Sequence, residues 1–309
     1  MELIRGLHNF GNCSGACVAT IGNFDGVHLG HQKILDQLKY EAMSSGLQSA
    51  VIIFEPQPIE FFAPERAPSR LTRLREKLEE FQRHDIDRVL CISFDEVLAN
   101  LSADDFIKQI LVDGLKIKEI IVGDDFRFAK NREGDFNTLK NAGKQHGFNV
   151  EMMETFVCDD ERISSTLIRQ YLADGEIEKA NRMLGRPYRI TGRVIHGEKR
   201  GRDLGFPTAN IELKRYLSPV HGIFSGRVHG LGEAGLDAVV YVGSRPVFNG
   251  EKEILEVHIL DFNHTIYGER IQVEFIEKLR GDENFDSGEE LIEQINKDIE
   301  NARISLQTR

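Results

Sequence analysis

Short apolar runs alternate with amphipathic stretches through the first half of the chain. Five of these runs are rich in valine and isoleucine, as expected of strands buried in a sheet, and a segment of helical period separates each from the next. They are CVATIG, SAVIIFEP, DRVLCISF, IKEIIVGDD and FNVEMME. This alternation predicts a Rossmann-like α/β domain with a parallel, doubly wound sheet, which binds ligands in the loops that follow its strands.

From about Tyr188 the pattern changes to strands separated by Gly and Pro turns. Five runs are predicted to be short strands: YRITGRVIHG, GIFSGRVHG, LDAVVYVGSR, EILEVHILDF and RIQVEFIEKL. Their regular spacing predicts a closed antiparallel β-barrel. A helical segment, GEIEKANRMLGRPY, precedes them, and Gly185 and Pro187 at its end mark the boundary between two expected domains, 1–185 and 186–309.

A helix is predicted at the end of the chain, over Asp286 to Arg303. Ser287 and Glu290 have the spacing of a capping box at its start. Leu291, Ile295 and Ile299 repeat along one face, which we expect to pack on the barrel.

Composition narrows the class of protein. The 309 residues are 40% hydrophobic and 29% charged, near the average of globular proteins, and no apolar run is long enough to cross a bilayer. With no signal peptide evident and four scattered cysteines, we expect a cytoplasmic protein without a disulfide framework. The net charge of -11 argues against nucleic-acid binding. In the most basic stretch, Arg70 to Lys77, glutamates interleave with the cations, which predicts a solvated helix face.

The first strand runs into GNFDGVHLGHQKIL, which continues as a helix. His28 and His31 are three residues apart, so their side chains face the same way on the first helical turn. Gly26 and Gly30 leave room for a phosphate, and a helix N-terminus supplies donors and the positive end of a dipole. Two imidazoles there can stabilise charge on a nucleotide during displacement at the α-phosphorus, although such a pair in isolation is more often structural.

This H-x-G-H pattern after a first strand resembles the signature of the nucleotidyltransferase superfamily. FEPQPIEFFAPERAPSRLTRLREK, VGDDFRFAKNREGD and RISSTLIR further resemble the adenylyltransferase module of the prokaryotic bifunctional riboflavin kinase/FMN adenylyltransferases, and the resemblance spans nearly the whole chain. It implies that ATP phosphates lie between two sets of residues: Asn23, Asp25, His28 and His31 in one, and Arg162, Ser164, Ser165, Thr166 and Arg169 in the other. It also implies that Phe62, Asp125 and Phe128 line the flavin site.

The residues alone leave simpler alternatives open for these segments. The Ser-Ser-Thr run of RISSTLIR offers hydroxyls and backbone donors to an anion between two guanidinium groups, but it also suits an ordinary helix N-cap. Phe61 and Phe62 could flank a flavin ring or belong to the core. The chain departs from many relatives at Gln57 and Ala129, where histidine and glycine are common, and Ala129 is expected to reshape the loop beside the flavin.

In the second half, GEKRGRDLGFPTANIEL has the parts of a phosphate cradle although it is not a Walker loop. Its glycines expose backbone amides, its basic residues add charge, and Thr208 and Asn210 offer neutral oxygens that suit Mg²⁺. GFPTAN closely resembles the flavokinase motif of the same family, in which the Thr and Asn hold magnesium and ATP. The residues assigned to ATP and the metal are Gly197, Lys199, Gly201, Arg202, Gly205, Pro207, Thr208, Ala209 and Asn210.

The strand ILEVHILDF supplies a candidate base. Alternation places Glu256 and His258 on one face, and Glu256 matches the family's catalytic glutamate, expected to accept the proton of the ribityl 5′-hydroxyl. Without the PTAN motif, a solvated carboxylate on an edge strand would be the simpler interpretation. LRGDENFDSGEEL resembles the segment over the flavin, which makes Arg280 and Phe285 expected ring contacts, while Val247 stands where relatives often have threonine.

These observations predict one enzyme with two transferase activities. ATP phosphorylates riboflavin to FMN, then a second ATP adenylylates FMN to FAD, with Mg²⁺ needed in both halves. Two alternatives remain open from sequence: another nucleotidyltransferase, for cytidylyl or pantetheine transfer, with an unrelated barrel, or a flavin-binding protein without turnover. The expected partners are small molecules, and the sequence does not indicate an oligomeric state.

Overall fold

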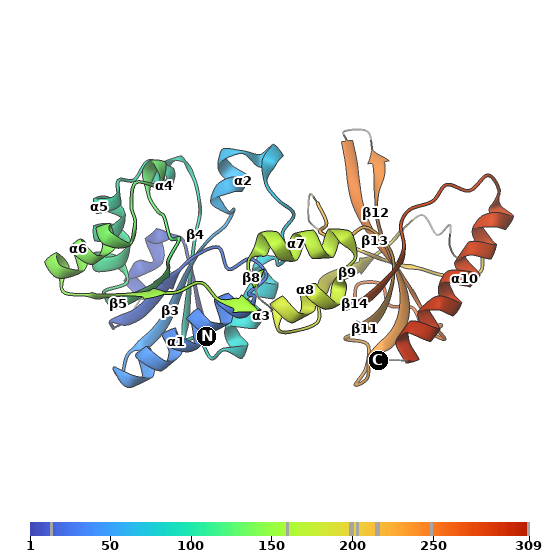
Figure 1. Cartoon of the computed structure of the whole chain (residues 1–309), viewed down its shortest axis with the longest axis horizontal. Helices are drawn as coiled ribbons and strands as arrows, with labels where there is room; N and C mark the ends of the chain where they lie inside the picture. Colours follow the sequence, from blue (N-terminus) through green and yellow to red (C-terminus); the bar gives the residue numbers. More distant parts are fainter. Residues whose placement is uncertain are drawn as a thin grey trace. The chain divides into compact units, whose positions relative to one another are not determined.

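The computed structural model describes residues 1–12, 15–158, 161–197, 201, 204–213, 217–247 and 250–307. The chain divides into two compact units. The first comprises Met1–Pro68 and Thr72–Ser164, and the second comprises Ser69–Leu71 and Ser165–Arg309. The ribbon of each is shown in Figure 1.

The first unit is built on a six-stranded parallel sheet in the order β1-β4-β3-β2-β5-β6. The strands are β1 (Glu2–Arg5), β2 (Cys17–Ile21), β3 (Gln48–Phe54), β4 (Arg88–Ile92), β5 (Ile117–Gly123) and β6 (Asn149–Met153). This confirms the predicted Rossmann-like sheet. From β2 the chain builds outward to β3 and β4, then returns to β5 on the other side of β2, so the carboxyl ends of β2 and β5 form a topological switch point, where such sheets bind ligands.

Helices cover both faces of this sheet (Figure 1). Successive residues of β2 enter different cores: Cys17, Ala19 and Ile21 join one hydrophobic cluster, and Val18 joins the other. The helices are α1 (Leu29–Ser44), α2 (Pro58–Phe62), α3 (Leu74–Arg83), α4 (Glu96–Ala99), α5 (Ala103–Phe106), the π-helix η3 (Ile107–Gly114) and α6 (Phe136–His146). Short 3-10 turns lie at η1 (Leu7–Asn12), η2 (Pro64–Arg66) and η4 (Lys130–Arg132), and a small hairpin joins β7 (Val157–Cys158) to β8 (Glu161–Arg162).

One prediction for this unit is wrong. The basic stretch from Arg70 to Lys77 was expected to form a solvated helix face, but α3 turns Glu76, Lys77 and Glu80 toward the interior, and Lys77 is 0% exposed. Hydrophobic period alone could not reveal this, because lysine is almost never fully buried unless it is paired.

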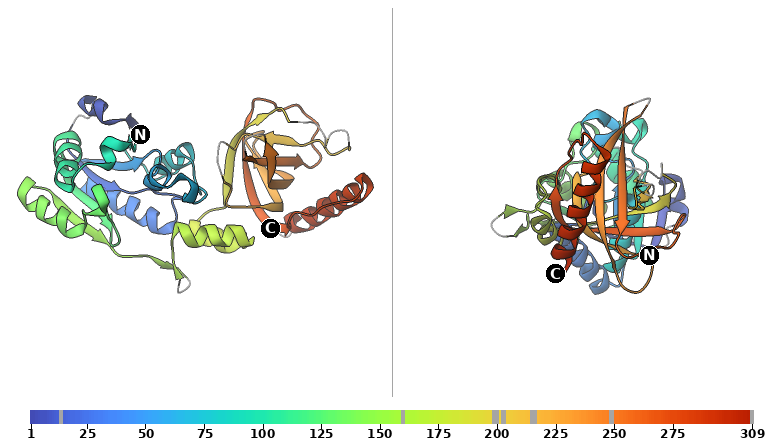
Figure 2. Two further views of the ribbon diagram at one scale, coloured as in Figure 1. Left: turned by 90° about the horizontal axis from the view of Figure 1, so that it is seen from above. Right: turned by 90° about the vertical axis from the view of Figure 1, so that its right-hand side faces the viewer.

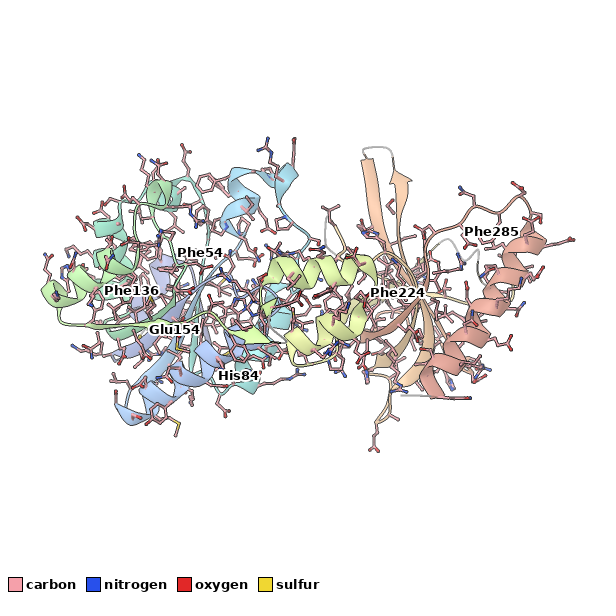
Figure 3. The ribbon with its side chains drawn as sticks, in the orientation of Figure 1. Phe54, His84, Phe136, Glu154, Phe224 and Phe285 are labelled. Carbon is pink, nitrogen blue, oxygen red and sulfur yellow. The ribbon has the colours of Figure 1, made fainter. Side chains whose placement is uncertain are left out.

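The second unit is a closed antiparallel barrel in the order β10-β13-β12-β11-β14-β9, as predicted. The strands are β9 (Arg189–Ile195), β10 (Ala209–Ile211), β11 (Gly222–His229), β12 (Leu236–Val247), β13 (Gly250–Ile259) and β14 (Arg270–Arg280). Phe224, labelled in Figure 3, is fully buried in the barrel and meets Phe275 edge-on at 5.3 Å between ring centroids. Two helices precede the strands, α7 (Ser165–Asp174) and α8 (Ile177–Leu184), and α8 ends at Gly185 in the left-handed conformation.

The last helix, α10 (Gly288–Gln307), lies along the outside of the barrel against β11, β12 and β14 (Figure 2). It begins and ends within a few residues of the predicted bounds. The backbone N–H of Glu290 donates to the Ser287 hydroxyl at 3.2 Å, as a capping box requires, while the Glu290 carboxylate accepts from the N–H of Asp286. The helix is therefore anchored at its start by its own side chains.

Candidate functional site

The turn between β2 and α1 lies at the switch point of the parallel sheet. Its residues Phe24 and Val27 adopt positive φ values of 47° and 41°, and Gly26 lies at 84°. Left-handed backbone is uncommon for any residue with a side chain and a genuine outlier for β-branched valine. Such strain persists only where surrounding contacts over-determine the conformation, and it clusters at functional sites.

His28 caps the helix that follows this turn. Its Nδ1 accepts a hydrogen bond from the backbone N–H of His31 at 3.3 Å, so in the neutral imidazole the proton is on Nε2. The rings of His28 and His31 stack with centroids 3.7 Å apart. A side chain at Gly30 would approach the His28 ring to 3.3 Å. The structure thus brings the two predicted imidazoles together at the N-terminus of a 16-residue helix, where backbone donors and the dipole favour an anion.

The other residues of the turn differ in exposure. Asn23 is exposed, as a ligand contact requires, whereas Asp25 is 3% exposed. One Asp25 oxygen accepts hydrogen bonds from the backbone N–H of Thr72 at 2.9 Å and from its hydroxyl at 3.3 Å. The geometry therefore favours a role for Asp25 in holding the turn over the predicted role in contacting phosphate.

The second predicted phosphate wall begins in β8. Arg162 is exposed and its guanidinium donates to Asp125 at 2.8 Å, so a predicted phosphate contact and a predicted flavin contact meet in one ion pair. An exposed pair of this kind is worth about 0–1 kcal/mol, which lets a phosphate replace the carboxylate at little cost. The neighbouring Asp124 accepts from Thr155, and this side-chain hydrogen bond lowers the pKa of Asp124.

Ser164 ends the first unit, and α7 of the second unit carries the remaining members of the predicted wall. Ser165 is the first residue of α7 and is half-buried, Thr166 is exposed, and Arg169 donates from Nε to the carbonyl oxygen of Ser69 at 2.5 Å. The run does open a helix, as both interpretations of RISSTLIR require.

The predicted flavin contacts of the first unit separate into two kinds. Phe62 is 63% exposed and meets Phe61 and Phe94 edge-on at 5.4 and 5.5 Å between centroids. Phe128 is 6% exposed and packs on Phe126 and Phe106 in the core. Sequence inspection missed Phe94, whose place at the end of β4, next in the sheet to β3, could have indicated it. Phe94 also meets the half-buried Phe54, labelled in Figure 3, edge-on, and this aromatic cluster is the surface that suits a planar ring.

In the barrel, the PTAN motif leads directly into β10. Asn210 pairs with Glu256 of β13 on one side and with Ile195 of β9 on the other. The Thr208 hydroxyl lies 3.5 Å from the Glu256 carboxylate. A side chain at Gly197 would overlap Asn210, with contacts of 2.3–2.6 Å, so this glycine allows the loop to approach the motif.

The rest of the predicted cradle is described only in part. The N–H of Phe206 donates to the carbonyl of Gly201 at 2.7 Å, and Gly205 has a φ of 89°, which closes the loop before PTAN. Pro207 accepts from His258 at 2.8 Å through its carbonyl, which links the motif to β13. Lys199 and Arg202 lie outside the described residues, so their charges stay a prediction.

A cavity of about 500 Å³ opens beside Thr208. Its walls combine the PTAN motif, the ends of β9 and β13, and the segment after β13. The lining residues are Val194, Pro207, Thr208, Ala209, Val257, Ile259, Phe262, Asn263, His264, Thr265, Ile266 and Tyr267. Sequence inspection missed the segment 262–267, because DFNHTIYG reads as an ordinary polar loop; the aromatic and histidine residues within it were the available signal.

Thr208, Asn210 and Glu256 suit magnesium. Two neutral oxygens and one carboxylate within one corner of the barrel match the hard oxygen ligands that Mg²⁺ takes when it also keeps waters and substrate phosphates. Among the described residues no group of three or more His, Cys, Asp and Glu side chains could hold a metal by itself.

Arg280 and Phe285, the predicted ring contacts of the barrel, lie together. The Arg280 guanidinium is 5.7 Å from the centroid of the Phe285 ring, and Phe285 is in the segment that leads into α10 (Figure 3). Arg280 also forms a two-pronged ion pair with Asp298 of α10, at 2.9 Å from Nε and 2.8 Å from Nη2. The pair positions the guanidinium before any flavin is bound.

Comparison with known proteins connects these two sites to one family. The family model for FAD synthetase matches residues 11–167, and the model for riboflavin kinase matches residues 184–306. The bifunctional riboflavin kinase/FMN adenylyltransferase of Escherichia coli (strain K12) is 48% identical over 98% of this chain and 97% of its own length. The protein of that name from Haemophilus influenzae is 46% identical over 98% of both chains. This chain belongs to the bifunctional riboflavin kinase/FMN adenylyltransferase family.

A solved structure shares the fold over nearly the whole chain. A crystal structure described as a macrolide-efflux protein from Streptococcus pneumoniae superposes with a TM-score of 0.83 at 28% identity, over 98% of this chain and 99% of that one. Among the described residues, no helix is both long and apolar enough to span a membrane. The membership and the fold predicted from the sequence are confirmed.

Proposed function

We propose that this chain converts riboflavin to FAD at two sites. In the barrel, riboflavin and ATP give FMN and ADP; at the parallel sheet, FMN and a second ATP give FAD and pyrophosphate. Both activities are those for which the chain's relatives are named. The observation that carries the proposal is that one chain holds a stacked histidine pair at a helix N-terminus and, separately, a Thr-Asn-Glu corner beside a cavity.

The two reactions differ in whether they need a general base to deprotonate the nucleophile. The nucleophile in adenylyl transfer is the phosphate of FMN, which is already largely a dianion at neutral pH. Its oxygen bonds to the α-phosphorus of ATP while the bond to the leaving pyrophosphate breaks, and no proton must be removed. This fits a site where His28 donates from Nε2, helix α1 supplies backbone donors, and the carboxylate of Asp25 is engaged in holding the turn.

In the kinase reaction the nucleophile is a neutral hydroxyl, so a base is useful. Glu256 accepts the proton of the ribityl 5′-hydroxyl as its oxygen bonds to the γ-phosphorus of ATP and the bond to ADP breaks. Thr208 and Asn210 would hold magnesium, which would neutralise phosphate charge. The cavity beside Thr208 receives the nucleotide, with Phe262 and Tyr267 offering aromatic surface in its wall.

The site assignments, the domain boundary at Gly185 and the need for Mg²⁺ belong to this proposal. FMN meets the cluster of the exposed Phe61 and Phe62 and the half-buried Phe94 in the first unit, and riboflavin meets Arg280 and Phe285 in the second. A cytoplasmic location stays a prediction, and so do the charges of Lys199 and Arg202 at the cradle.

Substitution of one residue in each site tests the assignment. His28→Ala removes a donor to the nucleotide, so FAD formation should fall about 100-fold or more while FMN formation from riboflavin is retained. Glu256→Ala should reduce FMN formation by about 10²–10⁴-fold. His84→Ala, which removes the histidine that follows α3 and bonds to Asp36 of α1, is the matched control and should change neither rate. Loss of both activities in a folded His28→Ala protein would contradict the division of labour.

A further inference from the structure

Residues 72–81 contact the strained turn before His28 at several points. The Thr72 hydroxyl accepts from the N–H of Gly26 at 2.8 Å, and the backbone and hydroxyl of Thr72 both donate to Asp25. Further along, in α3, the ring of Phe81 meets Phe24 edge-on at 5.5 Å between centroids. This segment therefore contacts three successive residues of the turn, Phe24, Asp25 and Gly26.

Lys77 of the same segment adds a contact to a fourth residue of the turn, Asn23. Its ammonium donates to the backbone carbonyl of Asn23 at 2.7 Å, and the residue is 0% exposed. Removing an ammonium from water is costly, and chains keep such a group only where specific contacts compensate for the desolvation. The bond is made to a backbone atom of the turn, so the Lys77 ammonium acts on the position of the turn whatever the side chain of Asn23 contacts.

We propose that Lys77, with Thr72, is a positioning residue for adenylyl transfer. The two side chains hold the strained turn in the conformation that directs His28 and the first backbone donors of α1 toward the nucleotide. This inference rests on the proposed function of the first unit and adds residues that neither the histidine motif nor the phosphate walls include. It also explains why Lys77 is buried, although the sequence of its segment predicts a solvated helix face.

The positive φ values supply the physical reason that positioning is needed. Phe24 and Val27 lie at 47° and 41°, where side chains clash with the backbone, so the turn relaxes toward ordinary φ values once its restraints are removed. His28 follows Val27 directly, and its ring moves with the backbone. A displacement of about 1 Å at a reacting group can cost about 100-fold in rate.

Lys77→Met tests the inference, because methionine keeps the length and apolar stem while removing the donor and the charge. We expect kcat for FAD formation to fall about 100-fold, with the KM for FMN changed less than threefold, because the flavin surface on α2 and in the segment after β4 is not part of the turn. Riboflavin phosphorylation by the same protein should stay within about twofold of the wild type, which shows that the barrel is unaffected.

Lys39→Met is the matched control in the same unit. The Lys39 ammonium also pairs within the sheet domain, with Asp87 at 3.5 Å, but Asp87 precedes β4 and so lies at the amino edge of the sheet, opposite the turn. Its FAD formation should match the wild type. Equal losses in Lys39→Met and Lys77→Met would indicate general destabilisation of the unit and overturn the inference, as would full adenylyl transfer by folded Lys77→Met.

A second pair of variants decides the matter if Lys77→Met does not fold. Thr72→Val is nearly isosteric but removes the hydroxyl that Gly26 binds, whereas Thr72→Ser keeps it. We expect kcat for FAD formation to fall about tenfold in Thr72→Val and to be restored to within about twofold in Thr72→Ser. Equal rates in the two variants contradict positioning by the hydroxyl. Absence of FAD formation in the wild-type chain would instead refute the proposed function.

Discussion

The ion pair between Arg280 and Asp298 gives the sharpest stability prediction. Its side chains are 15% and 5% exposed, and two guanidinium nitrogens reach the carboxylate at 2.8–2.9 Å. Removing one partner of a buried pair costs about 3–5 kcal/mol, because a charge is left without its counterion. Arg280 keeps some exposure and has Glu283 at 3.8 Å. We therefore expect Asp298→Ala to lower the free energy of unfolding by about 3 kcal/mol, the lower end of that range.

Hydrogen exchange read by mass spectrometry localises the loss. If α10 detaches from the barrel more easily, amides of residues 288–307 exchange faster by about 100-fold, since about 1.4 kcal/mol corresponds to tenfold. Peptides of α1 serve as an internal reference and should not change. Glu293→Ala, which removes an exposed pair with Lys297 on the same helix, should leave exchange in α10 unchanged.

A double substitution distinguishes the contribution of the ion pair from that of the apolar packing around it. Arg280→Met combined with Asp298→Leu removes both charges and keeps apolar volume, so exchange in α10 should return most of the way to the wild-type rate. Slow, wild-type exchange in Asp298→Ala would refute the claim that this pair fastens α10 to β14.

Three further predictions concern the stability of the first unit. Burial raises the pKa of Asp87, but hydrogen bonds from Ser49 and the charge of Lys39 outweigh it and leave the pKa lowered, so Asp87→Asn should lower the melting temperature at pH 7, and the difference should shrink as the pH falls through that lowered pKa. Burial and two neighbouring glutamates raise the pKa of Glu119 above 4.5, so Glu119→Gln should raise the melting temperature at pH 7 and have no effect below 4.5. Ala129 has a φ of 64°, and calorimetry should show that Ala129→Gly stabilises the unit by about 1 kcal/mol.

Period and turn chemistry were sufficient to predict most elements of the fold, and the exceptions are short. β1 has only four residues, Glu2–Arg5, and β10 only three, Ala209–Ile211, so neither offers enough positions to show an alternation. Both strands exist because a neighbouring strand supplies the hydrogen bonds: β4 pairs with β1, and β13 with β10. Pairing with a strand that is distant in the sequence cannot be predicted from the local pattern of residues.

The candidate sites show the same division between local and tertiary information. His28 and His31 could be predicted because a strand, a turn and a helix follow one another in the chain. The burial of Phe128 and of Lys77 could not be predicted. It depends on contacts with residues distant in the sequence, Phe106 for Phe128 and Asn23 for Lys77. Spacing predicts which side chains share a face, but only the packed structure shows whether that face meets solvent or the core.

The central claim is that the two activities are carried by separate residues in one chain, and a bypass experiment tests it most directly. Glu256→Ala protein is supplied with FMN, ATP and Mg²⁺, and the flavins are separated by chromatography over time. The account predicts FAD at the wild-type rate, since the missing base serves only the formation of FMN. Failure of this folded variant to convert supplied FMN to FAD would contradict it.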